Sequence, residues 1–439
     1  MNFNKFFELA KEKGISESQI QISKSSSLSF ELFQHELDSY EVQSSQSIVA
    51  CGIYNGKFGS ARTERLDSTS FSYLIDQIIV SASVSEKSEA ASIFKGSEKY
   101  KKVSYFNKSL GETPVEEKIA ACKKLEDLIY AGDPSVSEVQ VGYSESSSSS
   151  EFYNSYGLKQ KQKDTYYTLF GMAVARRGEE IKNNFELDFG NDFSNFKPEE
   201  FAKKIVTETV KKFGAKSIKS GKYPTVLKKS IVASLVRAFL SSAVADEVQR
   251  HSSFLEGKLG EKVACSKLTV EEKPLTKNIF ASYFDDEGVA KTNKVIVKNG
   301  VLKQYFYNRE TGAKDGVEST GNGAWQGGKI GTNFSNIFVK PGKVSFDELI
   351  APIEEGVYIT EIQGLGTGLN PNSGNFSCQA EGYMIRGGKI AEPITLITMS
   401  GNLLKMFKSL KGFDKEAELT LSSVTCGNAY IKSMSIGGE

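Results

Sequence analysis

Histidine is scarce in this chain, with only His35 and His251 among the 439 residues. A hydrolytic zinc site needs about three side-chain ligands, and a pair of them is usually two histidines one helical turn apart. Neither histidine has such a neighbour, since His35 lies in the strand-like FELFQHELDSY and His251 follows a predicted helix. The shortage also weakens Ser-His-Asp and Cys-His schemes, because each needs a base beside its nucleophile.

Cysteines and long apolar runs are also few. The five cysteines are odd in number, and none forms a CxxC pair: Cys51, Cys122, Cys265, Cys378 and Cys426. This pattern argues against a disulfide framework and a structural zinc site, and it favours a reducing cytoplasm. No stretch approaches the roughly 18 apolar residues that span a bilayer. The N-terminal MNFNKFFELAKEKG mixes charged and apolar residues, unlike a secretion signal, so we expect a cytoplasmic protein that starts near Met1 and has no membrane partner.

Charge of either sign is not in excess. The 55 lysines and arginines nearly balance the 54 aspartates and glutamates. No overall positive field would therefore hold the chain on nucleic acid or on an anionic membrane surface. We expect no nucleic-acid partner.

The first half of the chain repeats one order of elements, helix, then strands, then helix. The helices are predicted over residues 4–13, about 69–85, 115–132 and 198–214, with alternating strand patterns between them. We read this order as an internal structural duplication. The serine run at 146–150 is interpreted as a turn between two strands rather than as a flexible linker.

The second half changes character near Ser217. A short strand and a long helix over about 228–250 precede a series of strands and glycine-rich turns, among them NKVIVKNGVLKQYFYN with the Asn-Gly of a hairpin. One helix face, which we expect to pack against the strands, carries Ile231, Leu235, Ala238, Phe239 and Ser242. The residues expected to be solvated or to reach a partner are Arg237, Asp246, Glu247 and Arg250.

These patterns predict an α+β fold. The N-terminal α/β domain is expected over 1–214, with pseudo-repeats over 1–110 and 111–214. The C-terminal domain over 215–439 is expected to be mostly antiparallel β-sheet with one long helix.

The loop GLGTGLNPNSGNF, residues 364–376, superficially resembles a phosphate-binding loop. It lacks the GxxxxGK[ST] lysine and precedes a strand pattern rather than a helix, so a nucleotide site is not expected. Two interpretations stay open. The glycines can take positive φ in tight turns, or they can let an extended peptide approach and pair with a sheet edge.

The stretch DDEGVAKTNKVIVKNGVLKQYFYNRETGAKDGVESTGNG, residues 285–323, has an order of features that is hard to obtain by chance: an acidic pair, a hairpin, a tyrosine-rich strand and TGNG. It resembles the TldD/PmbA family, prokaryotic cytoplasmic proteins also called modulators of DNA gyrase and understood as subunits of a metalloprotease. The similarity continues through SSFLEGKLGEKVA (252–264), PGKVSFDELI (341–350), the segment 364–394, ITMSGNL (397–403) and the final CGNAYIKSMSIGGE.

The resemblance also distinguishes the two branches of this family. In the TldD branch, a helix before the equivalent of SFLEGKLGE carries HExxxH, whose histidines bind zinc and whose glutamate is the general base, and a late cysteine completes the site. Here Val236, Arg237 and Ser241 stand at those positions, and Cys426 matches the late cysteine. His251 is displaced by nearly three helical turns. The chain therefore resembles the PmbA, or TldE, branch.

Membership in that branch implies no catalytic residue and no metal ligand in this chain, and whether to call it an enzyme stays open. Zinc would belong to a TldD-type partner in a heterodimer acting on unfolded peptides or peptide precursors, with a homodimer possible for the isolated chain. Residues expected to line the peptide chamber are Ser241, Gly364, Gly366, Gly368, Phe376 and Cys426. The alternatives are a stand-alone peptide-binding or regulatory protein, and an independent hydrolase that uses Cys426 or a hydroxyl nucleophile.

Overall fold

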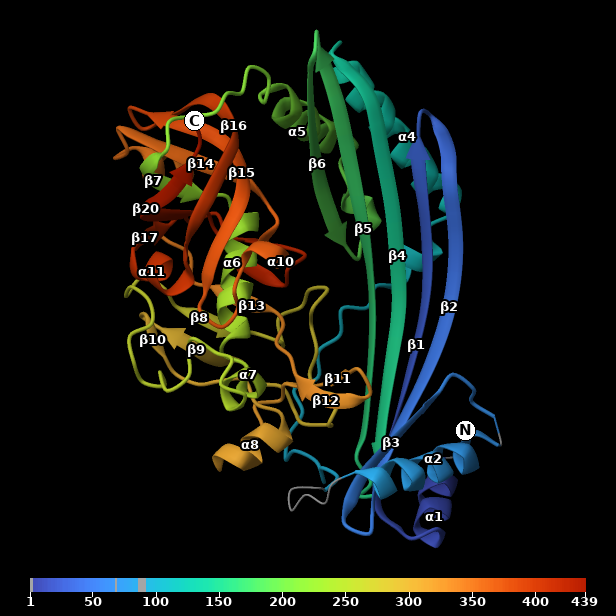
Figure 1. Cartoon of the computed structure of the whole chain (residues 1–439). Coiled ribbons are helices and arrows are strands. Elements are labelled where there is room, and N and C mark those ends of the chain that lie inside the picture. Colours follow the sequence, from blue (N-terminus) through green and yellow to red (C-terminus); the bar gives the residue numbers. More distant parts are fainter. Residues whose placement is uncertain (1–2, 68, 86–91) are drawn as a thin grey trace. The chain divides into compact units, whose positions relative to one another are not determined.

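The computed structural model describes residues 3–67, 69–85 and 92–439, which form two compact units (Figure 1). Unit 1 comprises Met1–Phe213, Lys277–Lys291 and Ala324–Ile330, and unit 2 comprises the remaining segments. We call Lys277–Lys291, which belongs to unit 1, the return segment. The sequence patterns place this segment and Ala324–Ile330 in the C-terminal domain, whereas the structure groups both with unit 1. The fold is α+β, as predicted.

Unit 1 is built on a six-stranded antiparallel sheet with the order β3-β2-β1-β4-β5-β6. The strands are β1 Ile15–Phe33, β2 Glu36–Tyr54, β3 Lys57–Thr63, β4 Val136–Asn154, β5 Lys159–Arg177 and β6 Glu180–Gly190. The helices are α1 Asn4–Glu12, α2 Ser70–Val84, α3 Lys108–Glu112, α4 Val115–Gly132 and α5 Pro198–Val210, with a 3-10 turn at Phe193–Asn195. The order helix, three strands, helix thus occurs twice, and β1 and β4 join the two sets at the centre of the sheet.

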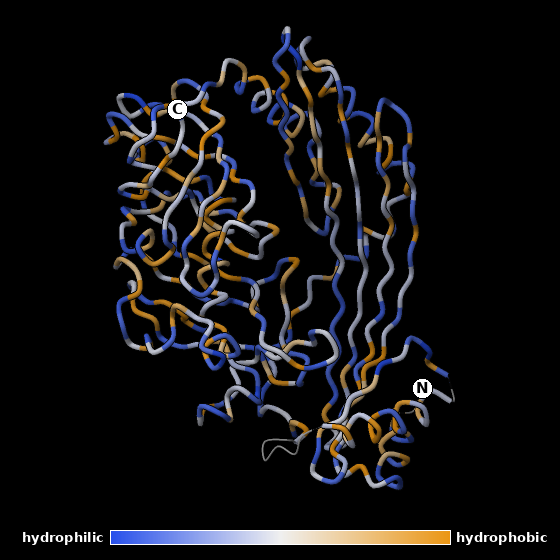
Figure 2. The backbone as a smooth tube through the Cα atoms, in the orientation of Figure 1, coloured by the Kyte–Doolittle hydropathy of each residue, from blue (hydrophilic) through white to orange (hydrophobic). Residues whose placement is uncertain are grey.

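The helices of unit 1 cover one face of the sheet. Ile20 and Ile22 of β1 are buried in a core with α1 and α2, while Phe30 and Leu32 of the same strand are buried in a second core with α4 and α5. All four are even-numbered, so they point to the same side of a strand. The odd-numbered residues of β1 face the other side. In Figure 2 the tube along the middle of the long strands is pale to blue, which reflects the many serines and other polar residues in these segments.

The serine run 146–150 lies in the middle of β4, so the predicted turn is wrong. Ser146 pairs with Ser27 of β1 and Ser150 with Ser23, in an unbroken antiparallel register, and β5 pairs along the other side. Serine has little strand preference of its own. Two neighbouring strands supply the backbone hydrogen bonds that hold the run extended, and no local sequence signal reports them.

Unit 2 contains two further six-stranded sheets, with the orders β10-β9-β8-β13-β19-β18 and β16-β15-β14-β7-β20-β17, and the second closes through an additional β16–β20 pairing. The first sheet consists of β8 Val270–Glu272, β9 Lys294–Lys298, β10 Val301–Leu302, β13 Ile337–Val339, β18 Glu418–Leu419 and β19 Val424–Cys426. The second consists of β7 Gly221–Leu227, β14 Glu355–Gln363, β15 Asn375–Arg386, β16 Lys389–Asn402, β17 Leu410–Phe413 and β20 Ala429–Gly437. A separate hairpin, most of which belongs to unit 1, is formed by β11 Gly323–Gln326 and β12 Lys329–Thr332. The helices are α6 Lys229–Ser241, α7 Ala245–Gln249, α8 Arg309–Asp315, α9 Phe346–Ile350, α10 Leu365–Gly368 and α11 Leu403–Lys408.

The helix predicted over 228–250 is two helices, α6 and α7. Val244 between them has extended backbone angles. The Phe306 N–H donates to Ala243 O at 2.9 Å, and the Ala245 N–H donates to Phe306 O at 3.0 Å. A tertiary backbone pairing therefore interrupts the helix at a point where the sequence contains no proline or glycine.

The predicted Asn-Gly hairpin is confirmed. β9 and β10 pair antiparallel around Asn299 and Gly300, whose φ angles are +49° and +81°. Two positive φ values in succession suit the tight turn that matches the twist of the strands.

Among the described residues, no helix combines the length and the apolar character needed to cross a membrane.

Candidate functional site

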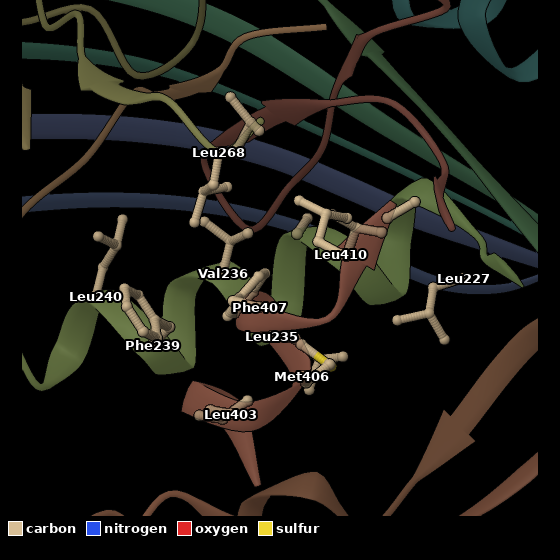
Figure 3. Packing of buried hydrophobic residues seen from close by; sticks show 14 of the residues in the cluster. Leu227, Leu235, Val236, Phe239, Leu240, Leu268, Leu403, Met406, Phe407 and Leu410 are labelled. Atoms are coloured by element: carbon tan, nitrogen blue, oxygen red, sulfur yellow. The ribbon is translucent and has the colours of Figure 1, made fainter. Parts of the chain in front are cut away.

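The helix α6 carries the three positions to which the sequence resemblance assigns the HExxxH motif, and its buried side is apolar. Val236 is 1% exposed and belongs to the main core of unit 2 together with Leu235, Phe239 and Leu240. Figure 3 shows these side chains packed with Leu268, Phe407 and their neighbours from other segments. The position that would carry the first histidine therefore fills the core with hydrocarbon.

Arg237 and Ser241 also do not suit a metal. The Arg237 guanidinium lies 4.9 Å from the centre of the Phe334 ring, and its Nη1 donates to Ser423 Oγ at 2.9 Å. Burial lowers the pKa of Arg237 from its ordinary value. Arg237 is therefore half-buried between a ring and a hydroxyl rather than freely solvated, and the alternative that it reaches a partner stays a prediction. Ser241 is exposed, and its Oγ donates to Arg237 O at 3.1 Å.

The residues at the three HExxxH positions do not fit zinc. A valine offers no lone pair, a guanidinium is cationic and has no acceptor, and a single hydroxyl is a weak ligand. Within the described residues, no group of three or more His, Cys, Asp or Glu side chains is placed to hold a metal ion.

Cys426 is fully buried on β19. Its Sγ donates to the carbonyl oxygen of Lys229 at 3.3 Å, at the start of α6. Since α6 has 13 residues, its two ends lie roughly 18 Å apart, and Cys426 and Ser241 are at opposite ends. Any contribution of Cys426 to a peptide chamber stays a prediction, and it would act through packing.

The Cys426 thiol is expected to be unreactive in the native protein. Burial, followed by the charge of Asp414, raises its pKa to about 12, against the weaker opposing effect of Lys229. At pH 8 the reactive thiolate is therefore a very small fraction. Alkylation followed by peptide mass mapping should label the partly exposed Cys265 in the folded chain and Cys426 only after unfolding. Equal labelling of both cysteines in the folded chain would contradict this burial.

The two histidines lie in different units and make separate contacts. His251 Nδ1 is 2.7 Å from Glu256 Oε1, with the imidazole 81% exposed. His35 Nδ1 lies 3.3 Å from Asp127 Oδ1. Both contacts are to carboxylates, and among the described residues neither histidine has a serine or cysteine in these contacts.

The glycine-rich loop 364–376 connects β14 to β15 in unit 2. Gly364 has φ +80° and begins α10, and Gly374 has φ +72°, so both support the turn interpretation. The loop also contains one helical turn, α10, that the sequence did not predict; Gly366 and Gly368 belong to it. Phe376 is buried, whereas Gly364 and Gly366 are exposed.

Side-chain hydrogen bonds fix the shape of this loop. Asn370 Oδ1 accepts from the backbone N–H groups of Asn372 and Ser373 at 3.1 and 3.0 Å. Asn402 Nδ2 donates to Ser373 O at 2.8 Å and thereby connects the loop to the end of β16. The strand pattern predicted after the loop is present as β15.

A hollow of about 250 Å³ lies beside the same strands. Its lining residues come from β14, β15 and β16: Glu361, Gln363, Gln379, Ala380, Glu381, Leu396, Ile397 and Thr398. Glu361 and Glu381 are paired in register, and Thr395 Oγ1 donates to Glu381 Oε1 at 2.8 Å. Leu396 is 83% exposed with φ +53°. The surface combines carboxylates, amides, a hydroxyl and three apolar side chains, which are groups that contact polypeptide backbone and side chains.

Sequence reasoning found the loop but missed this hollow. The hollow depends on the pairing of three strands, which no single stretch reveals. The segments TEIQ and QAEG carried the only signal, because they place glutamate and glutamine at alternate strand positions. Of the six predicted chamber residues, Gly364, Gly366, Gly368 and Phe376 belong to this one loop, whereas Ser241 ends α6 and Cys426 ends β19.

Comparison with known proteins gives a consistent result. Residues 220–438 match the PmbA/TldA metallopeptidase C-terminal domain, and residues 108–213 match the central domain of the same family. A PmbA metalloprotease homologue of Buchnera aphidicola is 28% identical over 66% of this chain and 63% of its own length. The chain thus matches under two thirds of the length of this curated relative.

Two solved structures resemble the whole chain. A modulator of DNA gyrase from Thermotoga maritima has a TM-score of 0.91 and 29% identity, with 99% of each chain covered. TldE from Thermococcus kodakarensis has a TM-score of 0.92 over 99% of this chain and all of its own, and at 21% identity this likeness concerns the fold alone. The domain matches cover most of the sequence and agree with the motifs at 252–264, 285–323 and 364–394. The chain belongs to the PmbA/TldD metallopeptidase family.

Proposed function

We propose that this chain is the PmbA/TldE-like subunit of a TldD/TldE-type zinc metalloprotease and carries no catalytic metal itself. A TldD-type partner bearing HExxxH would supply the zinc, the general base and the activated water. The substrates would be unfolded peptides or peptide precursors in the cytoplasm. The observation that carries the proposal is the apolar environment of Val236 at the first ligand position.

The proposed contribution of this chain is a shaped surface. A zinc-bound water reacts efficiently only when the scissile carbonyl is held near it in a shaped cavity. The loop 364–376 and the neighbouring hollow present exposed glycine backbone, carboxylates and amides on one sheet. An extended peptide could pair with such a surface through its backbone.

The isolated chain is expected to contain no stoichiometric zinc. The residues at the motif positions offer hydrocarbon, a cation and one hydroxyl, and none is a good zinc ligand. Elemental analysis after dialysis checks this, with a purified HExxxH-bearing family member as the positive control. One zinc per chain that disappears in His251→Ala or Cys426→Ser would contradict the assignment.

Partner identity can be tested without measuring activity. A tagged form of this chain, isolated from the extract of its own source, should retain an HExxxH-bearing subunit in a one-to-one ratio. Recovery of the chain alone or as a homodimer, in an extract that contains such a subunit, would favour a stand-alone peptide-binding or regulatory protein.

A further inference from the structure

The sheet face of unit 1 that the helices leave uncovered carries a polar pocket of about 360 Å³, called the serine trough below. Its floor follows the strand register. Ser45, Ser25, Ser148 and Asp164 are consecutive partners across β2, β1, β4 and β5. A second row lies two residues further along each strand. It consists of Ser47, Ser23, Ser150 and Gln162. Short hydroxyl side chains at these positions leave open space above the floor.

The return segment forms one wall of the trough and positions Asp286. The acidic pair that the sequence singled out is divided between two tasks. Asp285 Oδ1 accepts from the N–H groups of Glu287 and Val289 at 2.9 Å and shapes the turn. Asp286 instead lines the trough, where Gln21 Nε2 donates to its Oδ1 at 2.9 Å and the Trp325 N–H donates to its Oδ2 at 2.9 Å.

The trough holds two carboxylates and no cationic partner for them. Asp164 accepts from the Tyr105 N–H at 3.0 Å and from Gln162 Nε2 at 2.6 Å, and both donors are neutral. In the described part of the chain, no ion pair involves Asp164 or Asp286. Lys24 lines the floor, but it is an even-numbered residue of β1, so its side chain points to the helix-covered face, where its charge acts on Glu151.

Gln21 adds an independent sign of a missing ligand. The residue lines the trough, is only 8% exposed, and its Oε1 has no hydrogen-bond partner among the described residues. The amide orientation is determined, because Nε2 donates to Asp286 and the reverse orientation would place Oε1 against a carboxylate. A buried acceptor without a donor is unfavourable, so a donor-rich ligand would relieve that cost.

We propose that the serine trough binds an ammonium group carried by an extended peptide, either a lysine side chain or the N-terminal amine. An ammonium has three donors and one positive charge, which complement two carboxylates, an unused amide oxygen and the serine hydroxyls. That the carrier is a peptide rests on the proposed function above. Binding of the ammonium itself depends only on unit 1.

Trp325, the only tryptophan of the chain, provides the readout because its backbone N–H is bonded to Asp286. Fluorescence or indole NMR titrations should compare acetyl-lysine-methylamide, glycine-methylamide and acetyl-norleucine-methylamide. The first two supply a side-chain and an N-terminal ammonium, and the third supplies neither. We expect saturable binding of at least one ammonium probe and no binding of the norleucine probe at the same concentration.

Asp286→Asn and Asp164→Asn should each weaken binding about tenfold or more, since each removes one charge-assisted acceptor. The matched control is Asp38→Asn, the same charge change on β2, seven residues and about 23 Å from Ser45. It should change binding less than twofold. Circular dichroism verifies that each variant is folded, and Asp164→Asn remains informative if Asp286→Asn loosens the return segment.

Equal binding of the norleucine and lysine probes, no binding of any probe, or unchanged affinity in both folded trough variants would overturn the proposal. These outcomes are distinguishable from a failure of the proposed function. The latter shows in partner recovery and peptide cleavage, whereas the titrations use this chain alone.

Discussion

Replacing Gly368 with valine is expected to lower the free energy of unfolding by about 3 kcal/mol. A Cβ atom at position 368 would lie 2.1 Å from the carbonyl oxygen of Ser377 on β15, closer than atoms can approach. Because the obstructing atom belongs to a paired strand, α10 or β15 must move. Chemical denaturation followed by circular dichroism measures the effect.

Gly366→Val is the matched control, two residues away in the same helical turn. A Cβ at position 366 meets nothing within 4 Å, so its stability should change by less than about 1 kcal/mol. Equal stabilities of the two variants would show that the close approach of α10 to Ser377 does not restrict residue 368. If the loop contacts peptide in the assembled protease, Gly366→Val should also reduce cleavage while the subunit remains folded.

Local patterns predicted the elements whose stabilising contacts are encoded nearby. The helices at 4–13 and 115–132 have apolar residues at helical spacing, and the structure contains α1 and α4 there. The hairpin at Asn299 and Gly300 was predictable because positive φ at consecutive residues demands such residue types.

The failures share one cause, which is pairing with distant segments. Ser146–Ser150 is extended because β1 and β5 flank it. Val244 is extended because Phe306 pairs beside it. The return segment joins unit 1 through contacts such as the one from Tyr283 Oη to Lys161 O at 2.6 Å, although the two residues are 122 positions apart. None of these partners is visible within a short window of sequence.

The candidate site also has some features that the local sequence encodes and others that depend on distant segments. The motif positions Val236, Arg237 and Ser241 could be located by counting from SFLEGKLGE, and their chemistry follows from residue type. The serine trough and the hollow beside Glu381 could not be located in this way, because strand pairing brings together side chains that are far apart in the sequence. The acidic pair Asp285 and Asp286 was noticed in the sequence, but only the structure separates the turn-forming carboxylate from the one that lines a pocket.

Peptide cleavage is expected to require two chains. If the zinc and its general base belong to the partner, this chain alone should show no peptidase activity above background. If this chain shapes the substrate cavity, the partner alone should also cleave peptides only slowly. The mixture should exceed either chain by on the order of 100-fold, because positioning of the scissile carbonyl is lost when one wall is missing.

The division of labour between the two chains is tested by measuring cleavage of an unstructured peptide by this chain, by the HExxxH-bearing subunit and by their mixture, each with and without a zinc chelator. We expect activity only in the mixture, its loss with chelator and its return when zinc is restored. Chelator-resistant cleavage by this chain alone would contradict it.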